Sequence, residues 1–262
     1  MRKIGMSLGA INGLSTEEYA SLLKDHGFET TFELAKDLKQ TAANAEVLAR
    51  YGITFDSLHA PWHNINSIWR SNEYTEAAYA QLTNAIDICE AVGCPIAVVH
   101  LSSGLTPPPP TDTGRALFAK LVAYAEEKKV TVAFENQRML GNIGWAFEEF
   151  KDSPYVGFCY DCGHEGCFTP GRQYMPLFGH KLVCTHIHDN SGVFNEDLHR
   201  LPFDGTLDYD RVTRQIRESG FKGALVLEVD GKKDFYASLS PEAFFARASA
   251  AAHKLREMTD GE

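Results

Sequence analysis

Short apolar runs and longer segments of helical periodicity alternate along this chain, and the pair repeats eight times in 262 residues. Apolar runs of this length are typical of buried strands, and segments with apolar residues every three or four positions are typical of amphipathic helices. The predicted strands lie at 3–9, 30–35, 53–60, 95–102, 131–137, 155–164, 181–190 and 223–230. The predicted helices lie at 15–28, 38–52, 73–93, 112–130, 144–152, 171–180, 207–221 and 241–258.

Strands that alternate with helices favour a parallel sheet, and eight such units in about 250 residues favour an α/β fold closed into a single (β/α)8 TIM barrel. We therefore expect residues 1–262 to form one domain. A doubly wound open sheet is the alternative, but its usual GxGxxG turn is missing, because "SLGAING" at 7–13 does not fit. Local signals mark two helix starts: Ser15 with Glu18 reads as a capping box, and Ser240 precedes Pro241.

Composition narrows the classes of partner. The formal net charge is −10, and an acidic surface repels a phosphate backbone, so nucleic acid is disfavoured. No apolar run is long enough to span a membrane, and "MRKIGMSLGA" lacks the apolar core of a secretory signal. The six cysteines are therefore expected to be free thiols in a cytoplasmic protein.

Residues of metal-ligand type stand at or just after the ends of six successive predicted strands, where the active site of such a barrel lies. A single strand-end histidine is more often a hydrogen-bonded polar residue than a ligand. A carboxylate amid apolar strand residues, however, needs a partner, and the whole series together predicts a bound divalent metal. The series is His59, His100, Glu135, Asp161 with His164, His186 and Glu228, joined by Asp197 and His199 from the loop after the seventh strand.

This order of residues resembles the xylose isomerase-like TIM barrel superfamily, which includes sugar isomerases and epimerases and the endonuclease IV family. The resemblance covers essentially the whole chain. Its most specific segments are "HAP" at 59–61, "FEN" at 134–136, "DCGH" at 161–164, "HIHDN" at 186–190 and "DLHRLPFDGTLD" at 197–208.

The resemblance implies two possible metal contents. Epimerase-type members imply one ion held by Glu135, Asp161, His186 and Glu228. Endonuclease-type members imply three zinc ions, held by these four residues together with His59, His100, His164, Asp197 and His199. Histidine-rich sites suit zinc and carboxylate-rich sites suit manganese or magnesium, so the metal stays open, with cobalt and iron also possible.

Two functions follow as hypotheses. The first is a sugar, sugar phosphate or keto-sugar isomerase or epimerase that transfers a proton through a metal-stabilised enediolate. In resembled epimerases the glutamates corresponding to Glu135 and Glu228 are ligands and also base and acid. The alternative is a zinc phosphodiesterase of the AP endonuclease kind. The charge of −10 and the lack of a basic stretch favour the sugar enzyme.

Three further residues are candidates for substrate binding. Trp62 either stacks on a sugar face or packs on the rim, and Arg200 either binds an anionic substrate group or forms a surface salt bridge. His188 either touches substrate or makes a structural hydrogen bond, and Asp189 either orients a ligand or caps the turn.

We expect the partner to be a small-molecule sugar, and we expect no association with a membrane. A homo-oligomer is possible, although no residue identifies its interface.

Overall fold

A computed structural model describes residues 1–261 of the chain. The eight predicted strands are all present. They are Ile4–Ser7 (β1), Thr30–Leu34 (β2), Thr54–His59 (β3), Ile96–His100 (β4), Thr131–Glu135 (β5), Val156–Asp161 (β6), Leu182–His186 (β7) and Leu225–Leu227 (β8). Most strand residues are buried, and β6 and β8 are buried throughout, as expected of parallel strands covered on both faces.

Helices follow the strands in alternation. They are Thr16–Asp25 (α1), Leu38–Arg50 (α2), Ser67–Arg70 (α3), Thr75–Val92 (α4), Asp112–Lys128 (α5), Leu140–Glu149 (α6), Cys162–Phe168 (α7), Met175–Phe178 (α8), Tyr209–Glu218 (α9) and Pro241–Asp260 (α10). Two short 3₁₀ turns lie at Gly179–Lys181 and Asp234–Tyr236. The predicted capping box is confirmed, because the Ser15 side chain accepts from the Glu18 amide while Glu18 accepts from the Ser15 amide.

The strands are hydrogen-bonded in the order β7-β6-β5-β4-β3-β2-β1-β8. The described registers are parallel, for example Gly5 with Thr30 and His100 with Glu135. A parallel bridge between Ile187 and Leu227 links the end of β7 to β8, so the order of neighbours returns on itself. The predicted (β/α)8 barrel is therefore confirmed.

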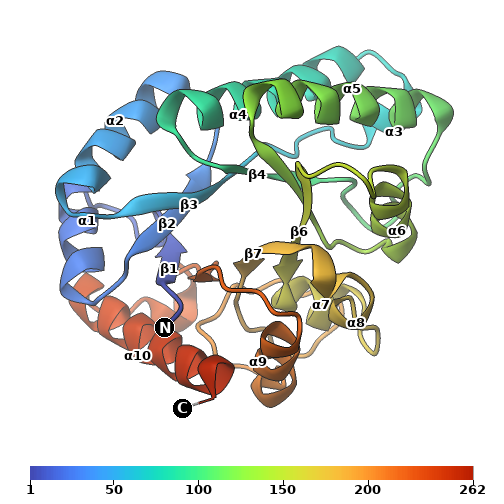
Figure 1. The fold of residues 1–262 in the computed structure, drawn as a ribbon. Coiled ribbons are helices and arrows are strands. Elements are labelled where there is room, and N and C mark those ends of the chain that lie inside the picture. Colours follow the sequence, from blue (N-terminus) through green and yellow to red (C-terminus); the bar gives the residue numbers. More distant parts are fainter. Residues whose placement is uncertain (262) are drawn as a thin grey trace. The chain divides into compact units, whose positions relative to one another are not determined.

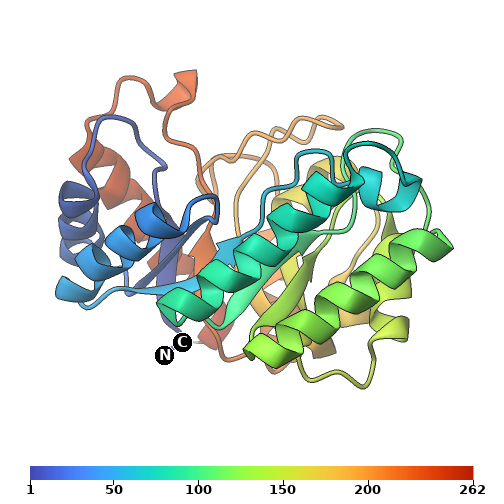
Figure 2. The ribbon, with the colours of Figure 1, turned by 90° about the horizontal axis from the view of Figure 1, so that it is seen from above.

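The described residues fall into two compact units, the first comprising 1–33, 43–56 and 160–261 and the second comprising 34–42 and 57–159. In the first unit, α10 packs against β1, β8 and α9 (Figure 1). In the second unit, α4 and α5 run side by side (Figure 2). Buried apolar side chains lie in both units.

The core of the second unit centres on Trp69, which is 2% exposed and packs on Phe118 and Trp145 at ring distances of 4.9 and 5.3 Å. Gly114 is required beside it, because a Cβ there would lie 2.0 Å from the indole ring. The expected thiols are free and buried: Cys89, Cys94, Cys159, Cys162, Cys167 and Cys184. Within residues 1–261 no helix combines the length and apolarity that crossing a membrane requires.

The sixth βα unit differs from the prediction. The strand was expected to continue to His164, with a weak helix within 171–180. Instead β6 ends at Asp161 and α7 begins at once, because the Asp161 carboxylate accepts the His164 amide at 2.7 Å and caps the helix. The predicted weak helix is reduced to the four residues of α8.

Candidate active site

The ends of β3, β4 and β5 bring His59, His100 and Glu135 together in the second unit. His59 Nε2 lies 3.3 Å from Glu135 Oε2 and 3.2 Å from His100 Nε2, and His100 also pairs with Glu135. The contact follows from the parallel register, which places His100 beside Glu135. All three side chains are buried, so the carboxylate is compensated by imidazoles rather than by water.

Trp62 borders this group from the loop after β3. Its ring stacks on His100 at 5.2 Å and meets the edge of His59 at 5.1 Å, while 44% of the residue stays exposed. A hollow of about 500 Å³ opens beside it, lined by Leu34, Lys36, Pro61, Trp62, His63, Asn64 and Ser103. Trp62 therefore packs on the rim, and its exposed part borders this hollow.

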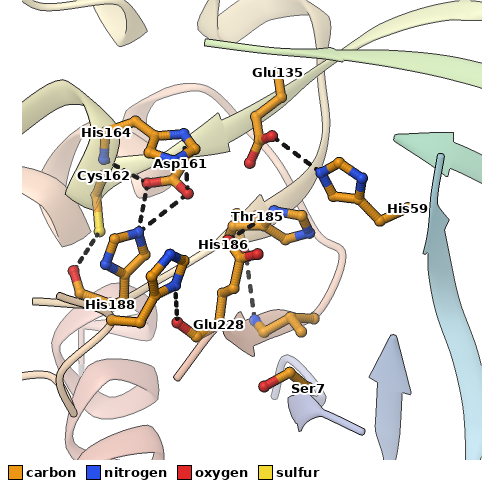
Figure 3. A network of polar contacts seen from close by, with 12 residues as sticks. Ser7, His59, Glu135, Asp161, Cys162, His164, Thr185, His186, His188 and Glu228 are labelled. Carbon is orange, nitrogen blue, oxygen red and sulfur yellow. Dashed lines mark hydrogen bonds and ion pairs between the residues drawn. The ribbon is translucent and has the colours of Figure 1, made fainter. Parts of the chain in front are cut away.

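In the first unit, Asp161 is the centre of a buried cluster (Figure 3). Its carboxylate lies 3.3 Å from His164 Nδ1 and 3.0 Å from His188 Nε2. Because Asp161 ends β6 and caps α7, the first turn of the helix directs His164 back toward it. Asp161, His164 and His188 each offer one ligand atom, and these atoms lie within 4.8 Å of one another.

The loop after β7 adds Asp197 and His199 to this cluster. Asp197 Oδ2 lies 3.3 Å from His164 Nε2 and 3.2 Å from His199 Nε2, and the His188 and His199 rings stack at 4.2 Å. Burial alone would raise the pKa of Asp197, but hydrogen bonds from His164 and His199 hold that pKa well below its usual range. Burial alone would lower the pKa of His199, but Asp197 and the charges of Glu228 and Asp161 raise it to about 9.

His186 and Glu228 form the third pair, from β7 and the residue after β8. His186 Nδ1 lies 3.2 Å from Glu228 Oε2, and Phe32 stacks on the His186 ring at 4.5 Å. His199 Nδ1 lies 2.9 Å from the Glu228 carbonyl oxygen, which links this pair to the loop after β7. His188, His199 and Glu228 also form a group with ligand atoms within 4.8 Å.

The donor atoms of the first unit fit a divalent cation. Three carboxylates, from Asp161, Asp197 and Glu228, lie among four imidazoles, the mixture of ligands that suits zinc or manganese. Within residues 1–261, His188 Nδ1 and Asp197 Oδ1 are buried and make no hydrogen bond. Buried polar atoms of this kind are costly unless a proton or a metal ion satisfies them.

Gly163 was not singled out from the sequence, yet it determines where His188 lies. A Cβ on Gly163 would lie 2.0 Å from His188 Cε1. The His188 ring therefore occupies the space of a missing side chain, and there it reaches Asp161 and stays 0% exposed. The glycine inside "DCGH" was the available signal.

Asp189 organises the loop that carries Asp197 and His199. Its buried carboxylate accepts four backbone amides, from Asn190 at 2.8 Å, Phe203 at 3.1 Å, Gly205 at 3.0 Å and Leu207 at 3.1 Å. Asp189 and Arg200 also exchange two backbone hydrogen bonds of 2.9 Å. Asp189 thus holds the backbone of this loop in place. The Arg200 guanidinium lies 4.8 Å over the Phe235 ring.

A second residue that the sequence did not single out is Glu165, in α7 and 1% exposed. It accepts hydrogen bonds from Arg211 Nη1 at 2.6 Å, the Tyr160 hydroxyl at 3.0 Å and the Tyr174 amide at 2.8 Å. This ion pair ties α9 to the helix that carries His164. An acid in a helix has no sequence signal of burial, because its partner lies 46 positions away.

Comparison with known proteins places this geometry in a family. The model of the family described as "Xylose isomerase-like TIM barrel" matches residues 18–256. An uncharacterised protein, y4fM of Sinorhizobium fredii, is 33% identical over 191 residues. That alignment covers 68% of this chain and 60% of y4fM, so this chain spans less than two thirds of that relative.

Two solved structures share the fold. A D-tagatose 3-epimerase-like protein superposes with a TM-score of 0.75 at 19% identity, covering 99% of this chain and 98% of its own. D-psicose 3-epimerase from Clostridium cellulolyticum, solved with D-tagatose, superposes with a TM-score of 0.78 at 14% identity, covering 98% and 99%. The match of the family over most of the sequence, on a barrel with this series of strand-end residues, shows that the chain belongs to the xylose isomerase-like TIM barrel family.

Proposed function

We propose that this protein is a divalent-metal-dependent isomerase or epimerase of a small sugar, sugar phosphate or keto-sugar. Membership of the family and the epimerases among its structural neighbours support the reaction class. The observation that carries the proposal is a pair of glutamates at strand ends, each beside an imidazole. Glu135 lies 3.3 Å from His59, and Glu228 lies 3.2 Å from His186.

In this proposal Glu135, Asp161, His186 and Glu228 hold one divalent ion. The four residues come from β5, β6, β7 and β8, and a barrel directs the carboxyl ends of its strands to one face. A bound divalent ion would polarise the substrate carbonyl and stabilise the negative charge that develops when the neighbouring carbon loses its proton. Manganese and zinc are the first candidates for this donor set, and magnesium, cobalt and iron are the others.

The two glutamates move the proton. One carboxylate removes it from the carbon next to the carbonyl, and the other returns a proton to the product. The Glu135 side chain is 0% exposed, which keeps water away from it, whereas Glu228 is 19% exposed. Trp62 offers its exposed ring to a sugar face, and Arg200 offers a cation to an anionic group. The buried His188 acts by orienting Asp161 rather than by direct contact with the sugar.

A zinc phosphodiesterase is the second candidate, and one observation favours it. Asp161, His164, His188, Asp197 and His199 form a compact group that could hold metal beyond a single ion. The formal charge of −10 speaks against a nucleic-acid substrate. The cluster around Asp161 also suits a sugar enzyme, in which its histidines would position the Asp161 carboxylate.

Metal content and isotope exchange test the proposal together. The protein is purified without chelator, its metals per chain are measured, and ketoses are then incubated with it in D2O. We expect about one ion per chain and deuterium at the carbon next to the carbonyl. Glu135→Gln and Glu228→Gln should each lower the exchange rate about 10²–10⁴-fold. Glu148→Gln, whose side chain is 77% exposed, is the matched control and should leave the rate unchanged.

The result that would favour the phosphodiesterase over the sugar enzyme is three zinc ions per chain, cleavage of a phosphodiester and no incorporation of deuterium. A metal-free protein whose exchange activity no divalent ion restores would contradict both candidates.

A further inference from the structure

A second hollow, lined by none of the strand-end residues, lies in the first unit where the two ends of the described chain meet. It is lined by Met1, Arg2, Arg217, Lys222, Thr259 and Asp260, and its volume is about 370 Å³. Pockets of about 300–1,000 Å³ are typical of small-molecule sites. The two ends of the described chain lie close together (Figure 2). Arg2 and Asp260 join them, because the Arg2 backbone amide and guanidinium both donate to the Asp260 carboxylate.

The charge of this hollow is opposite to that of the protein. Its described lining holds three cationic side chains, Arg2, Arg217 and Lys222, against one carboxylate, Asp260. The C-terminal ends of α9 and α10 also lie here and each contribute about half a negative charge. An excess of about one positive charge remains in a protein whose formal charge is −10.

Arg2 is the most constrained of these cations. It is 7% exposed, and its guanidinium donates to Asp260 and, at 2.6 Å, to the Phe221 carbonyl. Its Nε is buried and has no hydrogen-bond partner within residues 1–261. Burial and the nearby charge of Arg217 both lower the pKa of Arg2. The described residues therefore compensate the positive charge at this place only in part.

We propose that this hollow is an anion site that binds a phosphate group, supplied by free phosphate or by a small phosphorylated metabolite. Arg217 and Lys222 contribute exposed cations, of which Arg217 also donates to the Met258 carbonyl at 3.0 Å. Arg2 contributes a buried cation. Arginine and lysine side chains are the groups that bind phosphate oxygens most strongly. The site is separate from the strand-end carboxylates, so it does not depend on the sugar reaction.

Calorimetric titration of the metal-loaded protein at constant ionic strength tests this. The probes are inorganic phosphate and a hexose 6-phosphate, each against wild type, Arg217→Met and Lys222→Met. We expect saturable binding in wild type and a dissociation constant about tenfold weaker in each variant. Arg214→Met is the matched control, because Arg214 is exposed on the same helix but does not line this hollow.

Binding of both probes that weakens in Arg217→Met and Lys222→Met would identify the phosphate group as the ligand. Binding of the hexose phosphate alone, weakened in the same two variants, would identify a metabolite. Lys222→Met carries the test if Arg217→Met is poorly folded. The site is refuted if wild type shows no saturable binding, or if Arg217→Met and Lys222→Met bind as wild type does. An equal loss of affinity in Arg214→Met would also refute it, because the loss would then follow from the removal of any positive charge on this surface.

Discussion

Replacing Gly163 by alanine tests how the Asp161 cluster is assembled. Gly163 lies in the first turn of α7, and the added Cβ would be 2.0 Å from His188 Cε1 and 2.3 Å from His188 Nδ1. Non-bonded carbon atoms rest near 3.5 Å, so the ring must move by about 1.5 Å. Such a shift would break the 3.0 Å contact between His188 Nε2 and Asp161 Oδ1.

The expected loss of stability combines two opposing effects. Overpacking a buried site costs about 1–3 kcal/mol, whereas alanine is favoured over glycine in a helix by up to about 1 kcal/mol. The free energy of unfolding should therefore fall by about 1–2 kcal/mol. For a chain of this size, each kcal/mol lost lowers Tm by roughly 2–4 °C. The affinity for metal should fall about 10–100-fold, because a side chain that orients a ligand is displaced.

Gly166→Ala is the matched control in the same helix. A Cβ there would meet Leu207 at 3.4 Å, which is ordinary contact, so stability should be unchanged or slightly higher. Unfolding is followed by heat in chelator, and metal affinity by competition with a chromophoric chelator. In a His188→Ala background Gly163→Ala should carry no packing cost, because the ring is gone. If Gly163→Ala is as stable as Gly166→Ala and binds metal as wild type does, this account of His188 is wrong.

Three other perturbations test the framework around the cluster. Arg211→Met should lower the free energy of unfolding in urea by about 3–5 kcal/mol, because it leaves the buried Glu165 carboxylate without its cation, and adding Glu165→Gln should recover part of the loss. Asp189→Asn should cost about 2–4 kcal/mol, since an amide cannot accept all four backbone hydrogen bonds that the carboxylate accepts; an unchanged urea midpoint would contradict this. Burial raises the pKa of Asp56 to about 6, so this group lowers stability progressively as pH rises from about 4 to 6. The effect of Asp56→Asn on the free energy of unfolding should therefore be about 2–3 kcal/mol more favourable at pH 7 than at pH 4, as measured by urea titration of both proteins at each pH. Equal effects at the two pH values would contradict a raised pKa of Asp56.

The alternation of strands and helices could be predicted because it depends on local interactions. Apolar periodicity determines which segment is a strand or a helix, and Ser15 and Ser240 cap their helices through amides three residues away. The prediction was wrong where two local signals conflicted, a helix cap and an apolar run. The Asp161 carboxylate ends β6 and starts α7, whereas the apolar pattern alone extended the strand to His164.

The types of residue at the strand ends, and their order, are visible in the sequence and were enough to predict the barrel and the family. Three other features depend on how the folded chain packs: His188 faces Asp161, Gly163 makes room for it, and Glu165 is buried with Arg211. These contacts join residues that are far apart along the chain. A hydrogen bond or an ion pair forms only within a few tenths of an ångström of its best geometry, and partners 27 or 46 positions apart reach that geometry through packing rather than through periodicity.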